Sequence, residues 1–309
     1  MQQTTSQEIQ NGVALRRLAS TMSVVAAIAL VALKLLAYFA TGSVALLTSA
    51  VDALVDTGAS FVTYLGIRYS ARPPDHDHRF GHSKGEAVAA FTQAMFLAGA
   101  ALVLAVQSLQ RLAFPQRLAA INVGLLVITL SLIAALSLVL LQTWVLGKTN
   151  STAIAADRVH YLTDIAVNLA VLAALGITKA TGWTRADPVF ALLIAGYMLW
   201  NARAIARTAL VQLLDQELPE AARAGIKSAV LACAGASGVH DLRTRSSGDW
   251  VFIEYHLEVD GRLSVERGHA IGDATEAAVR ELLPGTVEVT AHLEPYGIDD
   301  EKLDNLIWR

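Results

Sequence analysis

The chain has 309 residues, of which 54% are hydrophobic and only 17% are charged. Soluble proteins carry about 25% charged residues, so this composition excludes a disordered or collagen-like chain and argues against a wholly soluble enzyme. Residues 1–211 hold 15 basic and 9 acidic residues, a net charge of +6, whereas residues 212–309 hold 9 and 18, a net charge of −9. An acidic C-terminal part would repel phosphates, so we expect no nucleic-acid partner. The single cysteine, Cys233, excludes an intramolecular disulfide.

Six mostly apolar stretches are each long enough to cross a bilayer, which takes about 20 residues. In chain order they are residues 18–40, 43–67, 87–110, 118–147, 153–177 and 188–210. Lys34 interrupts the first, and we expect its ammonium group to extend to the nearer membrane surface. The sequence therefore predicts an α-helical domain of six spans over residues 15–211, preceded by a short tail, residues 1–14.

Six spans place both termini on the same side of the membrane. With the N-terminus inside, the inner segments hold nine Lys and Arg residues and the outer loops hold four. Because basic residues concentrate on the cytoplasmic side, we expect both termini to be cytoplasmic.

Acidic residues interrupt the second and fifth spans. Asp52 and Asp56 lie four residues apart in the second span, and His160 and Asp164 have the same spacing in the fifth. This spacing puts each pair on one face of its helix. Ionisable groups in a membrane are costly and mark functional sites, and four oxygen and nitrogen donors suit a tetrahedral divalent ion, zinc above all. We therefore predict a metal site formed by these four residues.

The alternative for the acidic residues of this region is a set of protonated carboxyls bonded to neighbouring backbone, but that does not explain two matched spacings. Asp157 is adjacent to Arg158, and we expect an ion pair there rather than a ligand role. For Ser49 and Asn168 we expect hydrogen bonds between helices.

The connection after the second span is rich in histidine and aspartate. Pro73 and Pro74 end the helix, and the next residues include His76 and Asp77. We predict an exposed metal site here with Asp75, His78 and His82 as ligands; a solvated polar turn is the alternative.

The C-terminal region has the periodicity of a small α+β domain, residues 212–296, followed by a tail, residues 297–309. We predict helices over residues 219–232 and 265–283, with Ser264 as the N-cap of the second. Alternating apolar residues predict strands over residues 238–245, Trp250–Val259 and 286–294. The order helix–strand–strand–helix–strand resembles a ferredoxin-like or metallochaperone-like fold.

The remaining histidines fall in this domain. His256, His292 and Glu294 lie on polar strand faces, His240 opens the first strand, and His269 lies one helical turn from Asp273. These groups could converge on one or two metal ions bridged by a carboxylate; solvated surface histidines are the alternative. All eight histidines of the chain fall in the three candidate metal sites.

The combined motifs resemble the cation diffusion facilitator family, close to its bacterial zinc and ferrous-iron efflux transporters. The resemblance covers residues 15–294. The matching motifs are Asp-Ala-Leu-Val-Asp from Asp52, Phe-Gly-His-Ser-Lys from Phe80, His-Tyr-Leu-Thr-Asp from His160, Val-His-Asp-Leu-Arg-Thr-Arg from Val239, and His-Leu-Glu-Pro from His292.

The resemblance implies a homodimer in the bacterial inner membrane that exports a divalent metal from the cytoplasm in exchange for protons. It implies Asp52, Asp56, His160 and Asp164 as the transport site and Asp75, His78 and His82 as the loop site. It implies a two-ion cytoplasmic site formed by His240, His256, His269, His292 and Glu294, where Glu294 replaces the usual Asp. It also implies that Lys84 pairs with Asp215 near the dimer interface; two independent charges are the alternative.

The imidazole ligands favour zinc as cargo and regulatory metal, with cadmium or ferrous iron as alternatives, over magnesium or calcium. An intramembrane metalloenzyme is disfavoured because the chain lacks a His-Glu-x-x-His helix. A membrane metal sensor is disfavoured because the tail shows no kinase-like or DNA-binding element. The sequence therefore predicts a secondary transporter in contact with lipid, not an enzyme.

Overall fold

The computed structural model describes residues 2–42, 44–113, 121–183, 185–283 and 285–297. The chain divides after Leu210 into two compact units. Most of the predicted C-terminal tail, residues 298–309, and the start of the predicted fourth span, residues 118–120, lie outside the described residues.

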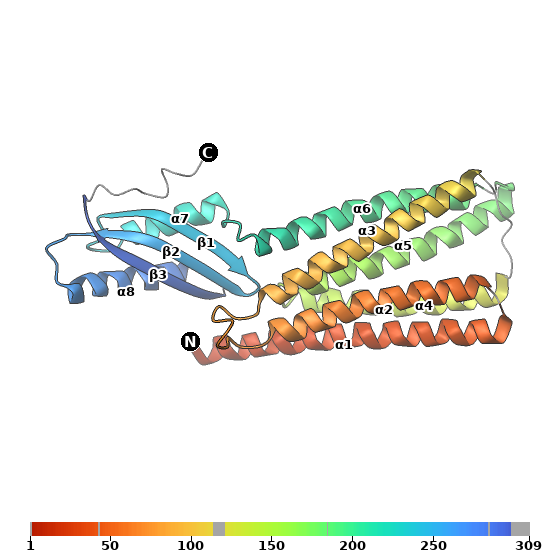
Figure 1. The fold of residues 1–309 in the computed structure, drawn as a ribbon, viewed down its shortest axis with the longest axis horizontal. Helices are drawn as coiled ribbons and strands as arrows, with labels where there is room; N and C mark the ends of the chain where they lie inside the picture. The colour runs from red at the N-terminus through yellow and green to blue at the C-terminus, as the bar shows by residue number, and fades with distance from the viewer. Residues whose placement is uncertain (1, 43, 114–120, 184, 284, 298–309) are drawn as a thin grey trace. The chain divides into compact units, whose positions relative to one another are not determined.

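The first unit consists of long helices (Figure 1). They are α1 (Gln2–Thr41), α2 (Val44–Ser70), α3 (Lys84–Ala113), α4 (Ile121–Leu146), α5 (Thr152–Thr181) and α6 (Ala186–Leu213). Within the described residues, α1, α2, α3, α4 and α6 are long and apolar enough to span a membrane. The helix α5 is not among these five; it has 30 residues and carries Asp157, His160 and Asp164. A multi-span helical domain is confirmed, and the sixth span stays a prediction.

The helix α1 begins earlier than expected. It starts at Gln2, so residues 2–14 are helical rather than a separate tail. No proline interrupts this polar segment, and the helix therefore continues beyond its apolar part.

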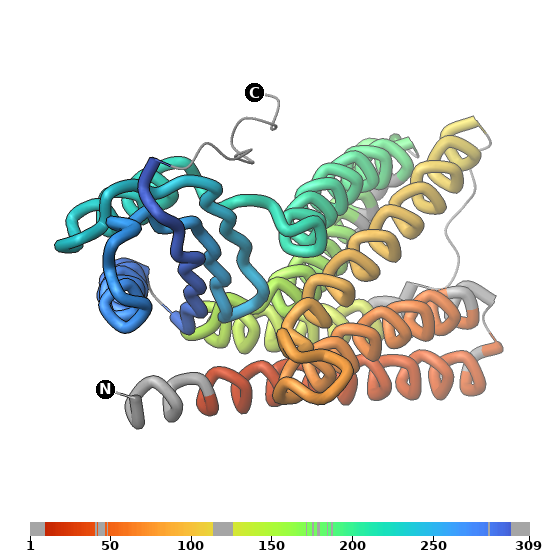
Figure 2. Tube along the Cα trace, turned by 60° about the vertical axis from the view of Figure 1, so that its left-hand side comes forward, coloured from red at the N-terminus to blue at the C-terminus, as the bar shows by residue number. Residues whose placement is uncertain are grey.

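Small residues allow the helices to approach closely. The helix α2 packs along α1 and α3, and α5 packs along α4 and α3; Figure 2 shows α1 and α2 side by side along their length. At Gly66 of α2, an added Cβ would lie 2.4 Å from the Cβ of Ala89 in α3. Glycine is therefore required at this crossing, as is common between membrane helices.

A buried ionic network joins four segments at one end of this unit. Glu86 of α3 lies 3.0 Å from the guanidinium of Arg16 in α1, and both side chains are buried. The hydroxyls of Ser151, just before α5, and Ser70 in α2 donate to the same carboxylate, at 2.5 and 3.4 Å. Because each charged group has a partner, the pair is tolerated away from water.

Large apolar side chains cover the outside of the helices. Phe39 is 77% exposed, Trp200 72% and Leu193 66%. Soluble monomers rarely expose apolar surface on this scale, so these side chains are suited to contact with lipid.

The second unit is a three-stranded sheet covered by two helices on one face. Its elements are α7 (Glu220–Leu231), β1 (Gly238–Ser247), β2 (Trp250–Val259), α8 (Val265–Leu282) and β3 (Thr286–Pro295). The strand order is β1-β2-β3, with β1 antiparallel and β3 parallel to β2. The predicted α+β order is confirmed.

The apolar faces of these elements form one core. Ile226 and Val230 of α7 and Val279 of α8 pack with Tyr255 and Leu257 of β2. The predicted N-cap of α8 is present, because the hydroxyl of Ser264 accepts a hydrogen bond from the Arg267 amide at 3.2 Å. Since both helices cover this face, the opposite face of the sheet is left to its polar side chains.

Candidate metal centres

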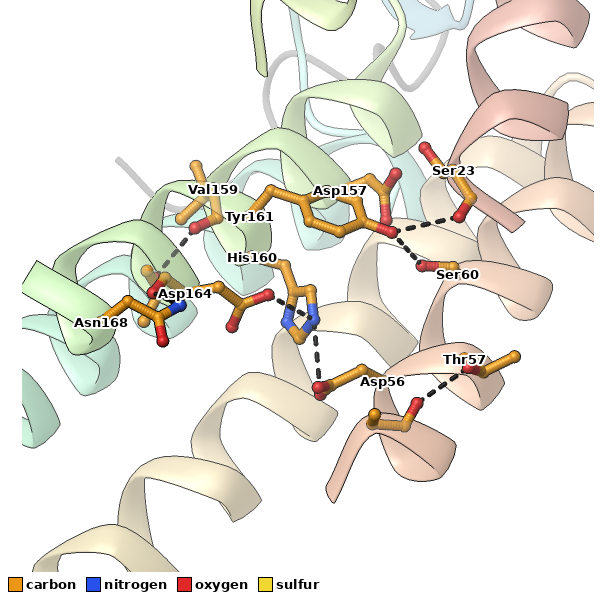
Figure 3. Close-up of polar contacts among 12 residues, drawn as sticks. Ser23, Asp56, Thr57, Ser60, Asp157, Val159, His160, Tyr161, Asp164 and Asn168 are labelled. Atoms are coloured by element: carbon orange, nitrogen blue, oxygen red, sulfur yellow. Dashed lines mark hydrogen bonds and ion pairs between the residues drawn. The ribbon is translucent and has the colours of Figure 1, made fainter. Parts of the chain in front are cut away.

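The helices α2 and α5 bring three of the predicted ligands together (Figure 3). The Nε2 atom of buried His160 lies 3.4 Å from Oδ1 of Asp56 and 3.7 Å from Oδ2 of Asp164. Ligand bonds to zinc are about 2.0–2.2 Å, so atoms around one tetrahedral zinc lie about 3.3–3.6 Å apart. The three donor atoms lie within 4.8 Å of one another, so their spacing fits a small divalent cation.

Asp52 lies beside this cluster rather than in it. It lines a cavity of about 240 Å³ together with Asp56 and Asp164, but the three-residue cluster is formed without it. The side chain of Asp52 is one turn from Asp56 on α2, where it faces the same space. The structure therefore joins three of the four predicted transport-site residues directly and the fourth through the cavity.

Lys34 of α1 adds a basic residue to this region. It lines the same cavity, and the expected extension of its ammonium group to the membrane surface stays a prediction. The helix α1 packs against α2, so this face of α1 is turned toward the acidic residues of α2.

Asp157 forms a different interaction from the expected ion pair. Its Oδ2 atom accepts a hydrogen bond from the Gln142 amide at 2.7 Å, and its side chain is buried. The adjacent Arg158 is directed to the hydroxyl of Thr143, at 3.5 Å. Neighbouring residues on a helix point about 100° apart, so the two side chains diverge. Asp157 is outside the donor cluster, as expected.

Tyr161 connects this region to two other helices. Its hydroxyl lies 3.0 Å from the hydroxyl of Ser60 in α2 and 3.3 Å from the carbonyl oxygen of Ser23 in α1 (Figure 3). These hydrogen bonds fix α5 against α1 and α2 at the residue next to His160, which helps to position the imidazole.

Ser49 and Asn168 also line the cavity. The amide of Asn168 donates to the carbonyl oxygen of Asp164 within α5, at 2.8 Å. We expected Asn168 to form a hydrogen bond between helices, but this bond lies within α5.

The loop after α2 forms a second cluster of donor atoms. One carboxylate oxygen of Asp75, Oδ1, lies 3.2 Å from Nδ1 of His78. The other, Oδ2, lies 3.2 Å from Nε2 of His82. His82 is buried, with its ring edge-on to Tyr69. These are the three residues that the sequence predicted, and their donor atoms lie within 4.8 Å of one another.

Backbone hydrogen bonds keep the central carboxylate of this loop ionised. The amide of His78 donates to Asp75 at 2.7 Å and that of Asp77 at 3.0 Å. The bond from the His78 backbone, above all, lowers the pKa of Asp75, so its oxygens are available as ligands at neutral pH. The extra histidine, His76, lies beside Asp77 and outside the cluster.

The sheet of the second unit aligns three histidines in one row. His240 pairs with His256 across β1 and β2, and His256 pairs with His292 across β2 and β3. Their rings are 5.1 and 4.8 Å apart. The row lies on the face opposite the helices, because β2 directs Tyr255 and Leu257 into the core on either side of His256.

Glu294 contacts all three histidines of this row. One oxygen lies 2.6 Å from Nδ1 of His256 and 3.6 Å from Nε2 of His292, and the other lies 3.0 Å from Nε2 of His240. A carboxylate with both oxygens facing imidazoles has the arrangement of a bridging ligand. The longer side chain of Glu294, compared with Asp, therefore still reaches its predicted partners.

Two further residues complete the description of this site. His269 lies 3.6 Å from Asp273 on α8, is largely exposed and is not brought to the cluster. Glu258, which was not predicted as a ligand, lies 3.5 Å from Nε2 of His240. It follows His256 by two residues, so strand alternation puts it on the same face. An added Cβ on Gly238 would lie 2.3 Å from the Glu258 carboxylate, so glycine leaves room for it.

The predicted ion pair between Lys84 and Asp215 joins residues of different units and stays a prediction. Within its own unit, Asp215 lies 3.4 Å from Arg245.

Two models of known protein families together match nearly the whole chain. A model of the cation efflux transmembrane domain matches residues 20–214, and a model of the cation efflux protein cytoplasmic domain matches residues 218–296. The chain is 43% identical over 270 residues to a cation-efflux pump FieF of Klebsiella pneumoniae, covering 87% of this chain and 89% of the relative. It is 42% identical over 285 residues to a FieF of Salmonella choleraesuis, covering 91% and 94%.

Solved structures match the C-terminal unit. One, titled as the zinc form of the putative zinc transporter CzrB, is 35% identical and covers 28% of this chain and 99% of that one, with a TM-score of 0.26. Another, of the C-terminal domain of MamM, is 30% identical and covers 25% and 96%, with a TM-score of 0.24.

Proposed function

The chain belongs to the cation diffusion facilitator family, and from this premise we propose that it exports a divalent metal cation, preferably zinc, from the cytoplasm in exchange for protons. The observation that carries the proposal is the cluster of Asp56, His160 and Asp164, which lies within helices long enough to span a membrane. Ionisable groups at that depth are costly unless they have a use, and an ion pathway gives them one.

The donor atoms of the cluster support zinc as the cargo. Two carboxylates and one imidazole combine oxygen and nitrogen, whereas magnesium and calcium prefer oxygen alone. Cadmium and ferrous iron accept the same ligands, so transport of both would follow from the same site.

Exchange with protons follows from the chemistry of the ligands. A metal binds the neutral imidazole of His160 and the ionised carboxylates, so protons and metal compete for one site. Release of metal on one side of the membrane therefore favours protonation, and the return of the protonated site carries protons in the opposite direction. Movement of the helices would expose the site to each side in turn.

We assign a regulatory role to the metal-binding residues of the second unit. His240, His256 and Glu294 lie on a sheet in a domain whose family model describes a cytoplasmic domain, which supports cytoplasmic termini. In this proposal the protein is a homodimer of the bacterial inner membrane, and metal bound to the sheet stabilises the dimer. The loop cluster of Asp75, His78 and His82 would bind metal more weakly because the loop is exposed.

The test uses purified protein in lipid vesicles that contain a zinc-sensitive and a pH-sensitive dye. External zinc should enter with protons moving the other way. Asp56→Ala should abolish both signals because it removes a ligand, whereas Asp77→Ala, an exposed aspartate outside the loop cluster, should leave them unchanged. Zinc binding without zinc entry in the wild-type protein would refute the proposal.

A further inference from the structure

One basic side chain lies in the cavity of the transport site. Lys34 of α1 is half-buried and lines the cavity of about 240 Å³ with Asp52, Asp56 and Asp164. Among the described residues that line this cavity, Lys34 is the one basic residue; the other lining residues include Ser131, Tyr161 and Asn168, which carry uncharged polar side chains.

The lysine is electrostatically linked to the carboxylates. It shares one cavity with both Asp52 and Asp164. A lysine within a membrane helix is unfavourable unless it reaches the interface or faces charged partners. Since Lys34 faces an acidic cavity, its position is explained by the second condition.

The charges in the cavity suggest what this lysine does. Three ionised carboxylates carry a charge of −3, and the ammonium of Lys34 changes the total to −2 while His160 is neutral. One divalent cation brings the total to zero. A cavity without the lysine would keep a charge of −1 after binding, which would hold the cation more strongly.

Resting on the proposed function, we propose that Lys34 is a fixed counter-charge that matches the cavity to one divalent cation and keeps that cation exchangeable. In this role Lys34 does not bind the metal. It lowers the affinity of the site by repulsion of the bound cation.

The experiment compares full-length Lys34→Met, Lys34→Arg and wild-type protein in detergent. Zinc binding is measured by titration calorimetry, and the binding that Asp56→Ala removes is assigned to the cavity. Because Met has a similar length without the charge, Lys34→Met should bind zinc at the cavity at least tenfold more tightly. In vesicles its maximal zinc flux should fall at least threefold, since release is slowed.

Two controls separate the charge from other effects. Lys34→Arg keeps the charge and should match the wild type in both measurements. Lys148→Met removes a lysine that lies over the ring of Trp144 outside the cavity and should also match the wild type. If Lys34→Met does not yield dispersed protein, Lys34→Gln makes the same comparison.

Unchanged or weaker cavity binding in the uncharged variants would overturn the proposal. If the wild-type vesicles take up no zinc, the proposed transport function fails, and the calorimetric comparison still decides whether Lys34 sets the affinity of the cavity.

Discussion

At the scale of single residues, Glu294 connects the histidines of the sheet. Its two oxygens face His240 on one side and His256 and His292 on the other. No other described carboxylate is in the three-residue cluster of this unit. The side chain therefore contacts all three imidazoles, and with His240 and His256 it forms a group of donor atoms within 4.8 Å of one another, which a metal ion could occupy.

Glu294→Ala should remove the zinc binding that belongs to the sheet. The expected loss of affinity is at least tenfold, because ligand and orienting carboxylates each contribute on this scale. Calorimetry of the full-length protein, in the Asp56→Ala background, measures it. Glu288→Ala changes an exposed residue of the same strand and should have no effect. Equal zinc binding by the two variants would show that Glu294 is not a ligand.

The polar faces of the second and fifth spans could be predicted from the sequence because a spacing of four residues puts side chains on one face of a helix. The structure brings Asp56, His160 and Asp164 of these faces together. The position of Lys34 in the cavity could not be predicted, since it depends on how α1 packs against α2. Glu258 was missed as a partner of His240 because strand alternation gives its face but not which residue of β1 lies opposite.

At the scale of elements, the network around Glu86 ties α1, α2, α3 and the start of α5 together. Glu86 lies 3.0 Å from Arg16, and both are buried. The helices α2 and α5 carry Asp56, His160 and Asp164, so this network helps to fix the relative positions of the proposed ligands.

Glu86→Ala should lower the free energy of unfolding by about 3–5 kcal/mol, because it removes the carboxylate partner of a buried arginine. Chemical denaturation of the full-length protein in detergent checks this value. Glu220→Ala breaks an exposed ion pair with Arg223 and should cost at most about 1 kcal/mol. A similar small cost for Glu86→Ala would show that the network does not stabilise the bundle.

Most elements could be predicted because their patterns are strong. The strand Trp250–Val259 and the capped start of α8 at Ser264 have the predicted bounds. The start of α1 at Gln2 could not be predicted, because a polar helical segment lacks the apolar stretch on which the prediction of a span depends. The bulge in β1 between His240 and Arg243 likewise leaves no clear signal in the sequence.

At the scale of the whole molecule, we propose two units with different tasks, a helical unit that moves metal and an acidic unit that responds to it. In a homodimer, metal bound by His240, His256 and Glu294 would offset part of the acidic charge of the C-terminal domain, which has a net charge of −9 over residues 212–309.

Removal of metal should therefore weaken the dimer. A chelator should shift full-length protein toward the monomer in light-scattering measurements, and added zinc should reverse the shift. His256→Ala should remain insensitive to both treatments. A wild-type dimer that ignores the chelator, or a His256→Ala variant that responds like the wild type, would contradict this role.

The central claim is that the cluster of Asp56, His160 and Asp164 carries the transported metal. The most direct measurement is zinc flux into vesicles by a variant that lacks the other two clusters, His82→Ala combined with His240→Ala and His256→Ala. This variant should still take up zinc at saturating concentration, and adding Asp56→Ala should abolish the uptake. Loss of uptake in the first variant, or uptake that survives Asp56→Ala, would contradict the claim.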